Sequence, residues 1–212
     1  MKRVKVIGWL KRITCMQAEW SKQMEPALGP TDALLLVHVQ QDFLPGGALP
    51  VRGGDLVVPV LNRWIARCQE AGARVIATRD WHPPDHCSFQ AQGGPWPVHC
   101  VAGTEGAAFT PALALPPEAP VFSQATSSET EAYSGFEGTG LGDDLKRAGI
   151  GRLLVGGLAT EYCVLHTVLA ALRLGFQVVV LGDGVRPVEV HPGDGERAME
   201  AMVEAGAVLL RG

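Results

Sequence analysis

Residues 153–163 read LLVGGLATEYC and decide which class of fold this chain adopts. The first five residues are apolar or glycine, which is typical of a short buried strand, and apolar residues then recur at helical spacing to about residue 174. Cys163 therefore lies where a strand turns into a helix, near the helix N-terminus. The dipole and free N–H groups there favour a thiolate and can hold an oxyanion. The alternative is that Cys163 is a small buried hydrophobic residue, and its position alone leaves both interpretations open.

The same alternation of strand and helix runs through the rest of the chain. Apolar runs of strand length cover residues 33–39, 74–78, 177–182 and 208–210, and residues 121–122 begin a further strand. Helical patterns cover residues 56–70, 141–148 and 195–205. Strands that are almost entirely apolar and alternate with helices indicate a parallel sheet covered on both faces. The sequence therefore predicts a three-layer α/β/α sandwich with a mainly parallel sheet of about six strands.

Length and charge limit the class of protein. The chain has 212 residues, of which 47% are hydrophobic, enough for one domain with a sizeable core. Residues 1–25 carry six Lys/Arg and two acidic residues, so we expect a basic N-terminal extension over residues 1–30 and a single domain over residues 31–212. The chain after residue 25 carries 12 basic and 20 acidic residues, a net charge of −8 that argues against general nucleic-acid binding.

Cysteine usage and hydropathy give expectations about location. The five cysteines are odd in number and lack paired spacing, which favours a reducing cytoplasm. No apolar run approaches the length of a transmembrane helix, so no membrane partner is expected. Residues 6–10 are too short for the core of a signal peptide. The sequence leaves open whether the chain forms a homo-oligomer.

A candidate metal site lies in residues 78–86, TRDWHPPDH, and residues 96–100, WPVHC. In an extended chain, residues two apart point to one side, so Asp80 and His82 can converge on one ion. His99 or His86 would add a third ligand, and one carboxylate with imidazoles suits Zn, Fe or Mn. The alternative is that each histidine bonds a loop carbonyl. Three histidines and an aspartate within twenty residues of a proline-stiffened loop favour the metal site.

Several motifs in one order carry a family resemblance. They are QQDFLPGGAL at 40–49, RDWHP at 79–83, WPVHCV at 96–101, EAYSGF at 131–136, GGLATEYCV at 156–164 and DGVR at 183–186. Over about residues 32–211 the chain resembles the nicotinamidases of the isochorismatase-like cysteine hydrolase family. The resemblance implies hydrolysis of nicotinamide, or of a related small amide such as pyrazinamide, with release of ammonia through a thioester on a cysteine.

The resemblance also implies catalytic residues, and two of the three depart from the family pattern. The family's cysteine maps onto Cys163, its aspartate onto His38 and its lysine onto Gln124. Gln124 is neutral and cannot supply a positive charge, whereas His38 can accept a proton near neutral pH and form a Cys–His dyad. The chain is then a hydrolase with reduced or altered activity, a hydrolase of a different small amide, or a metal-bound binding protein without turnover. A further alternative is that the two residues are changes introduced into the sequence.

The rest of the site is intact by the same resemblance. The family's metal ligands map onto Asp80, His82 and His99, and an extra ligand of some members maps onto His86. The ring pocket maps onto Phe43, Trp96 and Tyr133. The alternative for the aromatic residues is ordinary core packing, which is favoured more for Tyr162 than for Trp96. The Leu158–Ala159 bond maps onto a cis peptide that would turn the N–H groups of Ala159 and Cys163 toward an oxyanion.

Overall fold

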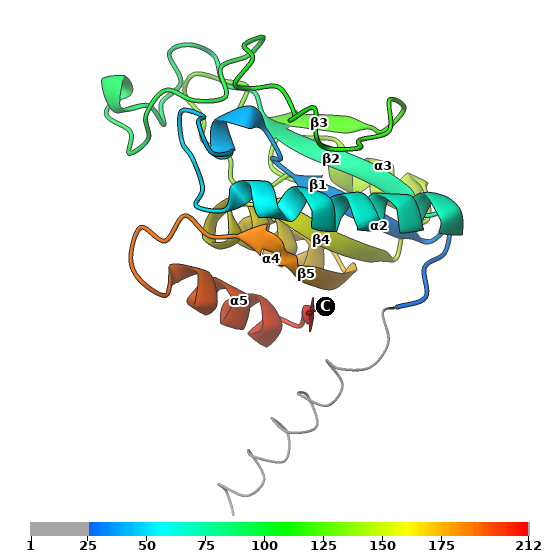
Figure 1. Ribbon diagram of the computed structural model, residues 1–212. Coiled ribbons are helices and arrows are strands. Elements are labelled where there is room, and N and C mark those ends of the chain that lie inside the picture. Colours follow the sequence, from blue (N-terminus) through cyan, green and yellow to red (C-terminus); the bar gives the residue numbers. More distant parts are fainter. Residues whose placement is uncertain (1–25, 212) are drawn as a thin grey trace, which may run out of the picture.

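The structure, a computed structural model, describes residues 26–211, which contain a six-stranded sheet (Figure 1). The strands are β1 (Asp32–Val37), β2 (Arg74–Asp80), β3 (Val121–Gln124), β4 (Arg152–Leu158), β5 (Gln177–Arg186) and β6 (Val208–Leu210). Their order is β3-β2-β1-β4-β5-β6, and every neighbouring pair is parallel. The predicted six-stranded parallel sheet is confirmed. The basic residues 1–25 lie outside the described part of the chain.

Helices cover both faces of the sheet, which completes the predicted three layers. The longer helices are α2 (Val57–Ala71), α3 (Leu141–Arg147), α4 (Leu165–Arg173) and α5 (Asp194–Glu204). In Figure 1, α2 crosses in front of the sheet, whereas α3 and α4 lie behind it. Because side chains alternate along a strand, Leu34 and Leu36 of β1 pack with α2, whereas Leu35 packs in the cluster on the other face. Burial on both faces explains why residues 33–37 of β1 are all apolar.

Short helical turns and strand ends depart most from the sequence-based expectation. The turns are η1 (Gln41–Phe43), η2 (Gly54–Leu56), η3 (Gln90–Gln92) and η4 (Thr160–Val164), and η4 is a π-helical turn that leads into α4. The expected helix after β4 therefore begins with a wider turn, and Cys163 lies in it. Strand β5 continues to Arg186 because its backbone resumes pairing with β4 at Val185, although glycines and Asp183 interrupt the apolar pattern.

Gly157 lets β4 approach β1 closely just before the candidate site. Its φ is +133°, a conformation that side chains rarely adopt, and a Cβ there would clash with the carbonyl oxygen of Val37. The register between β4 and β5 shifts between Val155 and Gly157. A glycine is therefore required where β4 ends and the segment toward Cys163 begins.

The loops that follow β1 and β2 gather at one end of the sheet (Figure 1). In a parallel sheet the carboxyl ends of the strands share one edge, and ligands of α/β proteins bind there. Within residues 26–211, no helix is long and apolar enough to cross a membrane.

Candidate active site and metal centre

Four of the predicted site residues lie at the carboxyl ends of four neighbouring strands, at one edge of the sheet. His38 follows β1, Asp80 ends β2, Gln124 ends β3 and Cys163 follows β4. Because the order β3-β2-β1-β4 places these strands side by side, residues far apart in sequence meet at their carboxyl ends. The sheet order thus explains why a site can be built from four separate motifs.

A narrow hollow opens at this edge, and it contains both metal-type and nucleophilic side chains. Its lining residues are Phe43, Leu49, Asp80, Trp96, His99, Tyr133, Ala159, Tyr162, Cys163 and Val188. All three residues expected around a ring, Phe43, Trp96 and Tyr133, are among them. Tyr162, which the sequence analysis assigned to core packing, packs against the core and also lines the hollow.

The aromatic side chains of the hollow hold one another in place. Trp96 Nε1 donates a hydrogen bond of 3.1 Å to the hydroxyl of Tyr133. The ring of Tyr162 stands edge-on to Trp96, with 5.1 Å between the ring centroids. Burial raises the pKa of Tyr133 to about 12, so its hydroxyl stays neutral. The indole N–H of Trp96 and the hydroxyl of Tyr133 therefore bond to each other, and the aromatic rings form an apolar wall suited to a flat aromatic ligand.

Asp80, His82 and His99 form a compact group of metal-type ligands. One ligand atom from each lies within 4.8 Å of the others, and all three side chains are buried. His82 Nδ1 lies 3.2 Å from the carbonyl oxygen of Ala125, and His99 Nδ1 lies 2.7 Å from that of Pro97. Each carbonyl oxygen accepts a hydrogen bond from the Nδ1–H of its ring, so the proton stays on Nδ1 and the Nε2 lone pairs of both rings are free to bind an ion.

The protonation of these histidines also suits a cation. Burial lowers the pKa of His82 to about 4, and burial likewise lowers the pKa of His99. Both rings are therefore neutral near pH 7, the form that binds metal. The carboxylate of Asp80 supplies the negative charge, so the three residues fit one divalent transition metal.

His86 is not brought into this group. Its ring stacks on His82, with 4.2 Å between centroids, but both of its ring nitrogens face other partners. Nδ1 lies 2.8 Å from the hydroxyl of Ser88, and Nε2 lies 3.2 Å from the carbonyl oxygen of Thr130. The expected role as an extra ligand therefore has no support in this geometry, because the ring nitrogens face Ser88 and Thr130 instead.

Gln40 is a positioning residue that the sequence analysis missed. Its side chain is fully buried; Nε2 donates 2.8 Å to the Asp80 carbonyl oxygen, and Oε1 accepts 2.8 Å from the Asp80 N–H. Nε2 also donates 2.9 Å to the carbonyl oxygen of Ala107. The amide thus fixes the end of β2 that presents Asp80. Gln40 lies in a motif quoted above, but nothing in the sequence distinguishes a buried glutamine from its exposed neighbour Gln41.

A second group, His38, Asp80 and Cys163, shares Asp80 with the first. One ligand atom from each lies within 4.8 Å of the others. His38 Nδ1 lies 3.4 Å from Asp80 Oδ2, and His38 Nε2 has no hydrogen-bond partner although the side chain is fully buried. His38 adopts φ of +47°, an uncommon conformation for a residue with a side chain, and such strain concentrates at functional sites.

Cys163 is buried beside this carboxylate, and its surroundings oppose ionisation. Burial raises the pKa of the thiol well above its usual value, and the Asp80 carboxylate adds to the effect. A hydrogen bond with the backbone of Ala159 acts in the opposite direction. The Leu158–Ala159 peptide bond that precedes this turn is cis. A thiol in this setting reacts as a nucleophile only when a neighbouring base or cation removes its proton.

Gln124 supplies no charge to the site. It is buried and pairs in register with Asp80 across β2 and β3. Its Nε2 donates 2.8 Å to the carbonyl oxygen of Ala132, while Oε1 has no hydrogen-bond partner. Gln124 thus places a neutral, unpaired oxygen beside the carboxyl ends of the central strands.

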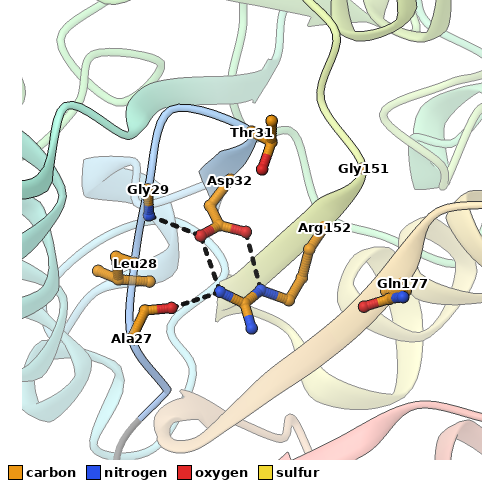
Figure 2. A pocket seen from close by; sticks show the side chains of 8 residues that line it. All are labelled: Ala27, Leu28, Gly29, Thr31, Asp32, Gly151, Arg152 and Gln177. Atoms are coloured by element: carbon orange, nitrogen blue, oxygen red, sulfur yellow. Dashed lines mark hydrogen bonds and ion pairs between the residues drawn. The ribbon is translucent and has the colours of Figure 1, made fainter.

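A second hollow lies at the opposite edge of the sheet, at the amino ends of β1, β4 and β5 (Figure 2). Arg152 is its prominent side chain, and it forms two hydrogen bonds of 2.7 and 2.8 Å with the carboxylate of Asp32 and a third, of 2.6 Å, with the carbonyl oxygen of Ala27. The charges neutralise each other, and no nucleophile lines this hollow. We therefore assign it a structural role.

The geometry defines a class of protein: an α/β domain with a buried cysteine, a carboxylate–imidazole metal group and an aromatic hollow at one sheet edge. Residues 32–212 match the Isochorismatase domain family. The chain belongs to this family.

Relatives and solved structures agree with that assignment. A nicotinamidase from Escherichia coli (strain K12) is 43% identical over 201 residues, covering 85% of this chain and 94% of that protein. A crystal structure of a pyrazinamidase of Pyrococcus horikoshii in complex with zinc is 48% identical, with a TM-score of 0.83 over 86% of this chain and 100% of that chain. A crystal structure of PnC1 from L. infantum in complex with nicotinate is 33% identical, with a TM-score of 0.81 over 89% of this chain and 96% of that one.

Proposed function

We propose that the chain is a nicotinamidase-like amidohydrolase, which converts nicotinamide or a related small aromatic amide into its acid and ammonia. The observation that carries the proposal is the position of Cys163, which lines an aromatic hollow and lies within 4.8 Å of a ring nitrogen of His38. The similarity to a nicotinamidase, to a zinc-bound pyrazinamidase and to a nicotinate-bound structure supports the substrate class.

The aromatic wall would hold the substrate ring. Phe43, Trp96 and Tyr133 line the hollow and would contact a flat heterocycle, which would orient its carboxamide toward Cys163. A divalent Zn, Fe or Mn ion held by Asp80, His82 and His99 would supply a Lewis acid that binds the ring nitrogen or a water. Because the ring, rather than the amide, carries most of the apolar contact, related aromatic amides such as pyrazinamide would also fit.

The protein residues then account for bond making and breaking. The Cys163 sulfur attacks the amide carbon while its proton passes to His38, forming a C–S bond and a negative carbonyl oxygen. The N–H groups of Ala159 and Cys163 stabilise that oxygen. His38 returns the proton to the amide nitrogen, the C–N bond breaks and ammonia leaves. Water then hydrolyses the thioester, which releases the acid and restores the thiol.

A second candidate function is binding without turnover. It is favoured by Gln124, which places no cation near Cys163, and by the raised pKa of the Cys163 thiol. In this candidate the hollow and the metal group bind a small aromatic molecule but the thiol stays protonated. Hydrolysis of a different small amide is a variant of the first proposal rather than of this one.

Ammonia release separates these candidates. We expect the metal-loaded full chain to release ammonia from nicotinamide or pyrazinamide, and we expect Cys163→Ala to release none. Equal background from both chains, with nicotinamide binding retained, would instead support the binding protein. We further propose a cytoplasmic site of action for a domain over residues 31–212, in keeping with the free state of all four described cysteines.

A further inference from the structure

Two groups of potential metal ligands meet at one carboxylate. Asp80 belongs to the group with His82 and His99 and also to the group with His38 and Cys163. Asp80 Oδ2 lies 3.4 Å from His38 Nδ1 and 3.9 Å from His82 Nε2. A carboxylate has two oxygens and about four lone-pair sites, so it can bind two ions at once. The shared residue therefore places two possible ion positions side by side.

The second group has the chemistry of a zinc site. Thiolate, imidazole and carboxylate are the three ligand types that zinc binds in proteins, and soft thiolate ligands select zinc over magnesium or calcium. All three side chains of this group are buried. Three protein ligands leave one position for a water or another oxygen.

Unpaired polar atoms around this group point to a missing partner. His38 Nε2 is fully buried and has no hydrogen-bond partner, and neither has the amide oxygen of Gln124. Buried polar groups are almost always paired, because leaving one unpaired is costly. A cation held by this group would pair with a lone pair of His38, and no lysine or arginine among residues 26–211 lines the adjoining aromatic hollow to compete with it.

We propose that His38, Asp80 and Cys163 form a second site for a divalent ion of the zinc class, which shares Asp80 with the site of His82 and His99. On binding, the Cys163 S–H bond breaks, a sulfur–metal bond forms and the proton leaves to solvent, with no change in oxidation state. The bound ion blocks the Cys163 sulfur, which would otherwise attack the amide carbon. It follows, if the proposed hydrolase function holds, that filling the second site inhibits turnover.

Metal stoichiometry tests the site without relying on activity. Metal-free full chain is dialysed against Zn²⁺, and bound zinc is measured by elemental analysis. We expect two ions per chain, and one in Cys163→Ser. Cys87→Ser, a half-buried cysteine outside both groups, is the matched control and should keep two. A native chain with one ion, or a Cys163→Ser variant that binds as many as the native chain, would overturn the proposal.

Cobalt identifies the ligand directly. Co²⁺ bound to a thiolate absorbs in the near ultraviolet, so the native chain should develop this band only as the second ion binds. His82→Ala should keep the band, and Cys163→Ser should lose it. If Cys163→Ser does not fold, alkylation of the native chain replaces it: Cys163 should react with iodoacetamide markedly more slowly at two zinc ions per chain than at one. No thiolate band, or equal alkylation rates, would contradict the second site.

Ammonia release measured in the same zinc titration keeps this inference apart from the proposed function. We expect activity to peak near one ion per chain and to fall as the second binds. If zinc saturates at one ion per chain and turnover persists, the second site is contradicted and the proposed hydrolase function stands. If two ions bind and no ammonia is released at any stoichiometry, the second site is supported and the proposed hydrolase function is contradicted.

Discussion

His38 Nδ1 lies 3.4 Å from Asp80 Oδ2, so the proposed base faces a carboxylate that also belongs to the metal-ligand group. The side chain of Asp80 thus lies close both to the candidate nucleophile, Cys163, and to the other two candidate metal ligands. Burial disfavours ionised Asp80, but His38, His82 and His99 hold the pKa of its carboxyl below the usual value. In the proposed mechanism a negative Asp80 would attract a proton on His38 Nδ1, much as a carboxylate does for the histidine of a catalytic triad.

The role of His38 can be tested by substitution in both directions. We expect His38→Ala to lower kcat for nicotinamide by about 10²–10⁴-fold, the usual contribution of general acid–base help. His38→Asp combined with Gln124→Lys should raise activity toward that of the family. The double change is needed because a lone carboxylate beside Cys163 would oppose thiolate formation, whereas a lysine gives both charges a partner. Ammonia release measures each variant, and full activity in His38→Ala would show that His38 is a bystander.

Metal binding should depend on His82 and not on His86. His82→Ala removes one of three ligands, so we expect the chain to lose the ion held by Asp80 and His99 while the domain stays folded. His86→Ala is the matched control, and it should retain that ion because both nitrogens of His86 face Ser88 and Thr130. Elemental analysis gives the metal content, and circular dichroism checks the fold. Metal loss in His86→Ala would show that this ring turns into the site.

Gln40 should matter for metal affinity although it touches no ion. Gln40→Leu leaves the backbone N–H and carbonyl of Asp80 unpaired, which should lower the free energy of unfolding by about 1–3 kcal/mol. Loss of such supporting bonds typically weakens metal binding roughly 10–100-fold. Gln41→Leu, an adjacent and more exposed glutamine, is the control and should change neither quantity much. Unchanged metal affinity in Gln40→Leu, measured by competition with a chelating dye, would contradict this role.

The metal-free chain should lose stability as the pH falls from about 6.5 toward 4. Burial lowers the pKa of His82 to about 4 in the folded chain, from 6.5 for an unperturbed histidine. Between these values the unfolded chain binds more protons than the folded chain, so protonation favours unfolding as the pH drops. The effect amounts to at most ~3 kcal/mol.

Urea unfolding at several pH values measures this dependence. The variant His82→Asn has no proton to gain at this position, so its stability should fall less over the same window. Identical pH profiles for the native chain and for His82→Asn would show that His82 titrates normally in the folded state.

Much of the fold could be predicted because the strands carry strong local signals. β1 and β4 are buried on both faces, so after their first residues, Asp32 and Arg152, their sequences contain only apolar residues and glycine and their positions are clear. The end of β5 was harder to predict, since Gly182 and Gly184 interrupt its pattern while the backbone continues along β4. The alternation of strands and helices predicts a parallel sheet, in which the carboxyl ends of the strands lie at one edge. Motifs that follow different strands could therefore be expected to meet there.

The candidate site was less predictable because its details depend on loop geometry. Residue types suggested a metal group, but only the folded loop shows that His99 turns inward while His86 bonds to its own loop. The sharing of Asp80 between two groups, and the support from Gln40, depend on contacts between strands distant in sequence. Periodicity and spacing contain no signal for such contacts.

The central claim is that Cys163 hydrolyses a small aromatic amide, and one measurement tests it most directly. Full-length chain carrying one zinc ion is incubated with nicotinamide, and nicotinate and ammonia are both quantified by chromatography and enzymatic assay. We predict equal amounts of the two products from the native chain, over many turnovers, and none above background from Cys163→Ala. Product formation by Cys163→Ala at the native rate, or no product from the native chain at one zinc ion, would contradict the account.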